Sequence, residues 1–175
     1  MANNCWYSMK IVGDKKNCDE FIKRLNSYEE PNHFWRIFSA EIYGVDYGID
    51  DNDKNKVAMY IDGDCAWSLE SCCRASGYSN GVDLFAVNTK ELDLEMEAYS
   101  REPGMCFEEH YIYKRGNCFA DECLDINVYW WDTTEFPTFE EFKKEYPDAP
   151  SIEHFEENNE AIVGGFEKNY ENWHI

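Results

Sequence analysis

Two close pairs of cysteines are the first residues in this sequence that could do chemistry, because paired thiolates are the usual ligands of structural zinc. Cys72 and Cys73 are adjacent, and Cys118 and Cys123 are separated by four residues. Adjacent side chains diverge by roughly 100° on a helix, and an odd spacing puts two side chains on opposite faces of a strand. The spacing therefore predicts no metal and no cofactor, and we expect these cysteines to be small buried hydrophobic residues.

A second arrangement imitates the start of a calcium-binding loop. Asp51, Asp53 and Asn55 alternate as the first ligands of such a loop do. Lys56 stands where the loop needs glycine, and Asp62 offers a shorter carboxylate than the usual bidentate glutamate. The pattern therefore predicts a solvated hairpin turn and no calcium site.

Nucleophilic catalysis would need a cysteine or serine beside a histidine. Cys106 and His110 are on one predicted strand and share a face, but their spacing separates them by roughly 13 Å. Carboxylate pairs are so abundant in this sequence that their presence does not identify a glycosidase or nuclease site. The sequence therefore predicts no enzymatic activity, and a thiol activated across the fold remains the third alternative.

The charge is the strongest compositional feature. The chain has 36 Asp and Glu residues and only 16 Lys and Arg residues, which gives a net charge of −20. Residues 121–175 hold 15 of the acidic and 3 of the basic residues, a net of −12. Such a field repels nucleic acid, so we expect little direct nucleic-acid binding and favour a basic protein partner or a cation.

An acidic stripe is the candidate contact surface. The spacing of Glu153, Glu156, Glu157 and Glu160 is helical, which predicts one row of carboxylates on a helix. Like charges at this spacing destabilise a helix by about 0.2–0.5 kcal/mol per pair, so solubility alone would not require them, although a solvated helix face remains the alternative. The predicted partner-binding set also includes Glu140 and Glu141 on the preceding helix and Glu102, Glu108 and Glu109 on a hairpin.

Hydrophobic periodicity predicts the elements that would carry these side chains. Period-two alternation and turn residues indicate strands at 5–12, 34–43, 57–61, 94–99, 105–114 and 118–131. A helical stripe is expected at 17–26, a second helix at 65–76, and short helices from 136 onward. The order predicts an α+β fold with a mainly antiparallel sheet, organised as one domain over 1–135 and an acidic helical C-terminal extension over 136–175 packed on the same core.

Two segments carry a family resemblance. The opening Asn4-Cys5-Trp6, followed by Gly13 and an amphipathic helix, and the later run over 99–107, YSREPGMCF, resemble the YubB-type ferredoxin-like domains of plasmids and phages. The resemblance implies a ferredoxin-like sheet with helices packed on one face and an origin in a mobile genetic element. It brings no catalytic residues.

Charge and resemblance together predict a function. Closely spaced carboxylates imitate the phosphates of duplex DNA, which follow one another about every 1.7 Å of helix axis. We expect a non-enzymatic, DNA-mimicking inhibitor of the anti-CRISPR kind that occupies the basic surface of a host defence nuclease such as a CRISPR effector. The alternative is a mobile-element binding domain that recognises a host protein or small ligand through exposed aromatic residues such as Trp35, Trp67, Trp130 and Trp131.

The expected location is the cytoplasm of a bacterial host cell. The N-terminal residues show no basic segment followed by a long apolar one, and no stretch approaches the roughly 20 apolar residues of a membrane span. Eight cysteines without a secretory signal also favour a reducing compartment. The sequence carries no prediction of the oligomeric state.

Overall fold

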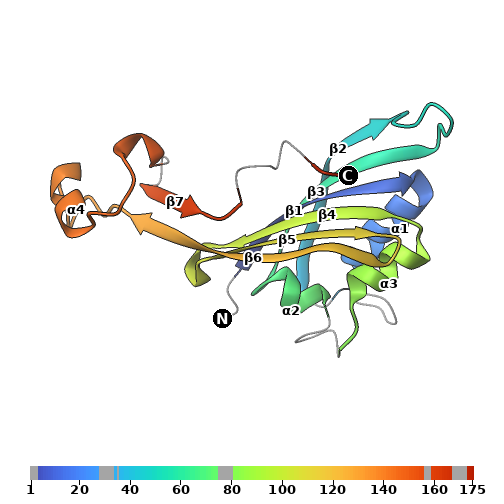
Figure 1. Ribbon diagram of the computed structural model, residues 1–175, viewed down its shortest axis with the longest axis horizontal. Coiled ribbons are helices and arrows are strands. Elements are labelled where there is room, and N and C mark those ends of the chain that lie inside the picture. The colour runs from blue at the N-terminus through green and yellow to red at the C-terminus, as the bar shows by residue number, and fades with distance from the viewer. Residues whose placement is uncertain (1–3, 28–33, 35, 75–80, 156–158, 167–172) are drawn as a thin grey trace.

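The computed structural model contains one antiparallel sheet of seven strands, which curls into a half-barrel (Figure 1). The strand order is β2-β3-β1-β4-β5-β6-β7. The structure describes residues 4–27, 34, 36–74, 81–155, 159–166 and 173–175. Long neighbouring strands with a right-handed twist rotate relative to one another, and this rotation accumulates into the curl.

The strands are long for a small protein. Their bounds are Asn4–Asp14 (β1), Ile37–Tyr47 (β2), Lys56–Ala66 (β3), Glu95–Glu102 (β4), Phe107–Lys114 (β5), Asn117–Trp130 (β6) and Glu160–Gly164 (β7). The helices are short: Lys15–Leu25 (α1), Leu69–Cys73 (α2), Leu84–Glu91 (α3) and Phe139–Glu145 (α4), with single 3₁₀ turns at Pro103–Met105 (η2) and Ile152–His154 (η3).

The main core lies between the sheet and helices α1, α2 and α3. Every second residue of β1 is buried in this core, namely Cys5, Tyr7, Met9 and Ile11. Helix α1 begins after Asp14, whose carboxylate accepts a hydrogen bond from Lys16 N, and it buries the expected stripe of Cys18, Phe21, Ile22 and Leu25. Each large apolar side chain so buried contributes about 1.5–3 kcal/mol to folding.

The predicted ferredoxin-like sheet with helices packed on one face is wrong. Strands β5, β6 and β7 continue the sheet past β4, and the short helices cover only part of the curled sheet (Figure 1). The residue patterns of the individual strands are correct, but local periodicity does not determine how many strands join one sheet. Helix α3 was not predicted, and the segment expected to be helical from residue 65 begins as the end of β3.

The predicted acidic helix over residues 153–160 is also absent from the structure. Glu153 lies in the turn η3, and Glu160 begins strand β7, while Glu156 and Glu157 lie outside the described residues. β6 has 14 residues and extends beyond β5, so its residues Ile126–Trp130 need another partner, which β7 supplies. Strand pairing therefore overrides the helical spacing of these glutamates.

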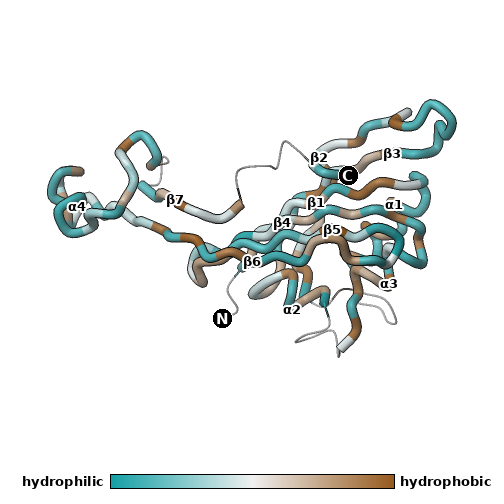
Figure 2. Tube along the Cα trace, in the orientation of Figure 1, coloured by the Kyte–Doolittle hydropathy of each residue, from teal (hydrophilic) through white to brown (hydrophobic). Residues whose placement is uncertain are grey.

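A second cluster of rings lies around α4. The rings belong to Trp131, Phe136, Phe139, Phe142, Tyr146 and Phe155. Phe142 is buried there, apart from the main core. Figure 2 shows that the segment around α4 is otherwise mostly hydrophilic. The domain boundary at residue 135 stays a prediction.

Within the described ranges, no helix combines the length and apolar composition that a membrane-spanning helix needs.

Candidate functional site

The face of the sheet opposite α1, α2 and α3 carries an unusual set of polar and aromatic side chains. We call it the open face. Antiparallel register places Ser8 of β1 between Asp62 of β3 and Tyr99 of β4, and Tyr99 in turn beside His110 of β5. Side chains of such neighbours point the same way. The open face consists of Trp6, Ser8, Lys10, Glu41, Tyr60, Asp62, Asp64, Glu97, Tyr99, Arg101, Glu108 and His110.

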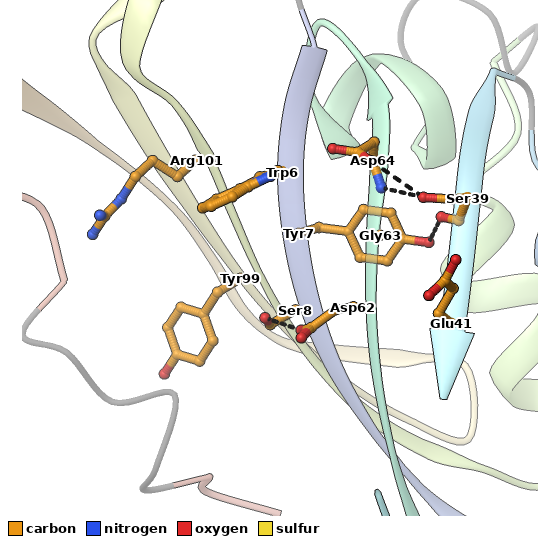
Figure 3. Close-up of a pocket in the computed structure, with 10 residues that line it drawn as sticks. All are labelled: Trp6, Tyr7, Ser8, Ser39, Glu41, Asp62, Gly63, Asp64, Tyr99 and Arg101. Carbon is orange, nitrogen blue, oxygen red and sulfur yellow. Dashed lines mark hydrogen bonds between the residues drawn. The ribbon is translucent and has the colours of Figure 1, made fainter. Parts of the chain in front are cut away.

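A pocket of about 470 Å³ lies on this face, across β1, β2, β3 and β4 (Figure 3). Three carboxylates enter it, Glu41 from β2 and Asp62 and Asp64 from β3. The aromatic side chains are Trp6, which is 60% exposed, and Tyr7 and Tyr99, which are buried. The lining residues are Trp6, Tyr7, Ser8, Ser39, Glu41, Asp62, Gly63, Asp64, Tyr99 and Arg101.

The pocket carboxylates interact with hydroxyl groups rather than with cations. Ser8 Oγ donates to Asp62, and Ser39 Oγ donates to Asp64 Oδ2 at 3.3 Å. In the part of the chain that the structure describes, neither of these aspartates nor Glu41 forms an ion pair with lysine or arginine. Arg101, the one basic residue of the lining, pairs instead with Glu108. The pocket thus keeps its negative charge.

A glycine allows the strands around the pocket to approach. The ring of Tyr7 crosses Gly63, and its hydroxyl donates to Ser39 O at 2.7 Å (Figure 3). A Cβ at position 63 would lie 2.1 Å from that oxygen and 2.5 Å from the Tyr7 hydroxyl. Burial raises the pKa of Tyr7 far above its usual value, so it remains a neutral donor.

A second polar cluster lies beside the pocket, around the fully buried carboxylate of Glu97. Its Oε1 lies 3.0 Å from His110 Nε2 and 2.7 Å from His174 Nδ1, and the Tyr99 hydroxyl donates to it at 3.1 Å. The other ring nitrogen of His110 lies 2.9 Å from Glu122 Oε2. These residues join β4, β5, β6 and the C-terminal segment.

The hydrogen bonds determine the charge of this cluster. Burial by itself raises the pKa of Glu97, but hydrogen bonds from His110, His174 and Tyr99 outweigh it and hold the pKa at about 2. Burial lowers the pKa of His110, and its contacts with Glu97 and Glu122 reverse this and raise the pKa above the usual value. Glu97 is therefore a carboxylate at neutral pH.

Three of the predicted partner-binding residues are buried inside the protein. The carboxylate of Glu102 caps turn η2, where Met105 N donates to it. Glu108 pairs with Arg101 and accepts from Phe166 N at 2.7 Å. Glu109 accepts from Leu69 N, Glu70 N and two hydroxyls, although burial still raises its pKa. In this conformation these carboxylates hold the protein together and do not form a contact surface.

The remaining predicted acidic residues that the structure describes are dispersed. Glu140 and Glu141 are exposed on the first turn of α4, where Glu141 also forms a capping box with Thr138. Glu153 is exposed on η3, and Glu160 is half-buried at the start of β7. The structure therefore brings none of them into one helical stripe.

The predicted aromatic residues within the described ranges are dispersed as well. Trp130 is 58% exposed, and Trp67 is 37% exposed with a left-handed φ of 70°. Trp131 packs in the cluster around α4, and Trp35 lies outside the described residues. Trp6, which lines the pocket, was not predicted as a binding residue. Trp6 alternates with the buried residues of β1 and therefore lies on the opposite face of that strand. This alternation is the sequence pattern that could have identified it as a surface residue.

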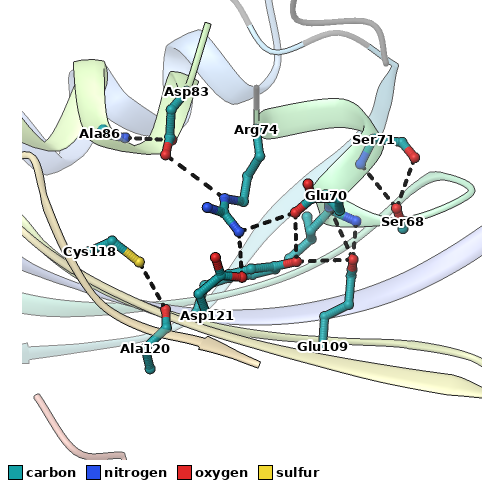
Figure 4. A network of polar contacts seen from close by, with 12 residues as sticks. Ser68, Glu70, Ser71, Arg74, Asp83, Ala86, Glu109, Cys118, Ala120 and Asp121 are labelled. Atoms are coloured by element: carbon teal, nitrogen blue, oxygen red, sulfur yellow. Dashed lines mark hydrogen bonds and ion pairs between the residues drawn. The ribbon is translucent and has the colours of Figure 1, made fainter. Parts of the chain in front are cut away.

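A third polar network, on the side of the helices, is structural (Figure 4). Arg74 lies 5.0 Å above the ring of Tyr111 and forms ion pairs with Glu70, Asp83 and Asp121. These contacts join α2 and the residue preceding α3 to β6. One guanidinium offsets only one of these three carboxylates, so the network keeps a net negative charge while its contacts connect these elements.

No protein-family model matches this chain, and no curated protein or solved structure is significantly similar to it. The resemblance to YubB-type domains therefore stays a prediction.

Proposed function

We propose that this protein is a non-enzymatic binding protein that inhibits a basic nucleic-acid-binding enzyme by receiving one of its arginine or lysine side chains in the open-face pocket. The observation that carries the proposal is the set of three pocket carboxylates, Glu41, Asp62 and Asp64, which form no ion pair with a cation in the described part of the chain. The chain around them has a net charge of −20.

The chemistry of the pocket suits a guanidinium or ammonium group. Carboxylates form the strongest hydrogen bonds with these cations, and a planar guanidinium also stacks on aromatic rings. Trp6 is exposed at the pocket, and Tyr99 lies on the neighbouring strand. A volume of about 470 Å³ is sufficient for one long basic side chain together with water.

The partner class follows from the same charges. An enzyme that binds DNA or RNA presents arginine and lysine residues to phosphates, so a carboxylate pocket competes with the nucleic acid for them. Exposed carboxylates outside the pocket, such as Glu140 and Glu141, accelerate the encounter through long-range attraction. The proposed target is a host defence nuclease such as a CRISPR effector in a bacterial cytoplasm, and the proposed source is a plasmid or phage.

The test is competition for DNA by the purified protein, measured with candidate nucleases at low and high salt. We expect the double substitution Asp62→Asn and Asp64→Asn to weaken inhibition at least tenfold. The matched control is Asp51→Asn with Asp148→Asn, which removes the same charge from two exposed positions outside the pocket. Equal losses in the two variants would show that only net charge matters, and direct DNA binding by the protein would contradict mimicry.

A second candidate function is recognition of a small organic cation. Trp6 and Tyr99 beside carboxylates resemble the aromatic sites that hold alkylated ammonium groups. Titration with a trimethyllysine peptide, followed by tryptophan fluorescence, distinguishes the two functions. Saturable quenching that disappears in Trp6→Phe would favour the small cation, whereas binding only to an intact basic protein would favour the inhibitor.

A further inference from the structure

We propose that Glu97, His110 and His174 form a binding site for a divalent transition-metal ion, best matched by zinc, which fastens the segment Trp173–Ile175 to the open face of the sheet. The three potential ligand atoms, one carboxylate oxygen and two imidazole nitrogens, all lie within 4.8 Å of one another. The inference does not depend on the proposed function, and it differs from the expectation of no metal, which was based on the cysteine pairs.

The distances are close to those of a metal site. His110 Nε2 and His174 Nδ1 lie 3.0 and 2.7 Å from the same oxygen of Glu97. Zinc bonds of about 2.1 Å in a tetrahedron separate neighbouring ligand atoms by about 3.4 Å. To admit an ion, the Glu97 oxygen needs to move about 0.4 Å away from the His110 nitrogen and about 0.7 Å away from the His174 nitrogen. The two nitrogens, which lie within 4.8 Å of each other, must reach the same spacing.

The surroundings of His110 fit a metal ligand. Its Nδ1 lies 2.9 Å from Glu122 Oε2, which is the distance at which this carboxylate accepts a proton on Nδ1, and its Nε2 faces Glu97. Metal-binding histidines commonly have a carboxylate in this position. When the ring carries a proton on both nitrogens, Nε2 donates to the Glu97 oxygen. A metal ion bound between the two atoms would replace that proton.

The donor set indicates the type of metal. Two imidazole nitrogens and one carboxylate oxygen form a common zinc set, and they also suit other first-row divalent ions. Glu97 is fully buried and His110 is 7% exposed at its side chain, whereas His174 is 55% exposed. A metal ion could therefore reach the site from the side of His174, and the net charge of the protein attracts it.

The consequence is a fixed C-terminal segment. The ring of Trp173 lies 5.8 Å from that of Tyr99 and 6.3 Å from that of Tyr60, and Lys10 Nζ donates to the main-chain oxygen of Ile175. Tyr99 also lines the pocket. A metal at His174 would hold these contacts and keep an aromatic side chain next to the pocket.

The experiment measures metal binding by the full chain after treatment with a chelator and under reducing conditions. Calorimetry with zinc and visible spectroscopy with cobalt(II) report stoichiometry and ligand type. The main variant is His174→Ala, because this side chain is 55% exposed and its loss should cost less stability than loss of a buried ligand. The control is His154→Ala, an exposed histidine on η3 outside the cluster.

We expect the wild type and His154→Ala to bind one equivalent of zinc, with a raised melting temperature, and His174→Ala to bind at least a hundredfold more weakly. Glu122→Gln should weaken binding about 10–100-fold, as loss of a carboxylate behind a histidine ligand does. The absence of stoichiometric binding at micromolar zinc would overturn the proposal. So would equal binding by His174→Ala, or thiolate charge-transfer absorption of cobalt, which would place the metal on Cys106, Cys118 or Cys123.

Discussion

The carboxylate of Glu109 accepts a hydrogen bond from the backbone N–H of Leu69 at 2.8 Å, which ties the middle of β5 to the first residue of α2. The N–H of Glu70 donates to the other carboxylate oxygen at 3.2 Å. The first backbone N–H groups of a helix have no acceptor within the helix itself, and these are two of them. A carboxylate that the sequence suggested as a contact for a partner therefore serves as the anchor of a helix.

Replacing Glu109 should be costly for stability. Glu109→Ala leaves one buried and one half-buried backbone donor and the hydroxyls of Ser100 and Tyr111 without this acceptor, and we expect a loss of about 2–4 kcal/mol in the free energy of unfolding. Urea denaturation followed by circular dichroism measures it. The control Asp125→Ala, at an exposed position of β6, should change stability by less than about 0.5 kcal/mol. Similar effects of the two changes would contradict the anchor role.

Gly63 should tolerate no side chain. In Gly63→Ala the new Cβ would collide with Ser39 O and the Tyr7 hydroxyl, so β2 and β3 must shift, and we expect a loss of about 3 kcal/mol. Gly48→Ala is the matched control: its φ of 67° is strained for alanine, but nothing lies within 4 Å, so the cost should be about 1 kcal/mol. Thermal denaturation compares the variants, and a smaller loss at position 63 would refute the close approach.

Trp6 should matter for binding and little for stability. Its side chain is 60% exposed, so Trp6→Ala should change the unfolding free energy by less than about 1 kcal/mol while weakening partner binding at least tenfold. Trp130→Ala is the control, because this tryptophan is 58% exposed but does not line the pocket. Affinity measurements on both variants decide the matter, and a greater loss with Trp130 would move the binding surface to the end of β6.

The two neighbouring glutamates of α4 should respond differently to substitution. Glu141 Oε2 accepts from Thr138 N at 3.2 Å within the capping box, whereas Glu140 lies in the same turn without this contact. We expect Glu141→Ala to destabilise α4 by about 1 kcal/mol and Glu140→Ala by a few tenths. Hydrogen exchange of the α4 amides measures the local effect, and equal protection in both variants would argue against the capping box.

Reductant should leave the melting temperature unchanged. All eight cysteines are free thiols in the structure, and five of them, Cys5, Cys18, Cys65, Cys72 and Cys73, are buried as apolar residues. Differential scanning fluorimetry with and without dithiothreitol tests this expectation. A lower melting temperature in reductant would indicate a disulfide between two of these residues.

Local patterns in the sequence were sufficient for several elements. The alternation of β1, the stripe of α1 and the two hairpins formed by β2 with β3 and by β5 with β6 were predicted, because each depends on residues close in the chain. The acidic composition was equally plain, and it still determines the class of partner that we propose. Turn residues such as Gly116 marked where the strands reverse.

Tertiary structure alone decided which of these side chains meet and which are buried. Glu97 and His174 are 77 positions apart, and only the return of the C-terminal segment to β4 brings them together. Periodicity can assign Glu108 and His110 to one face of β5, but whether that face contacts water depends on what covers it. Likewise, β7 forms because the long strand β6 leaves backbone groups that need partners, and this requirement outweighs the helical spacing of the glutamates.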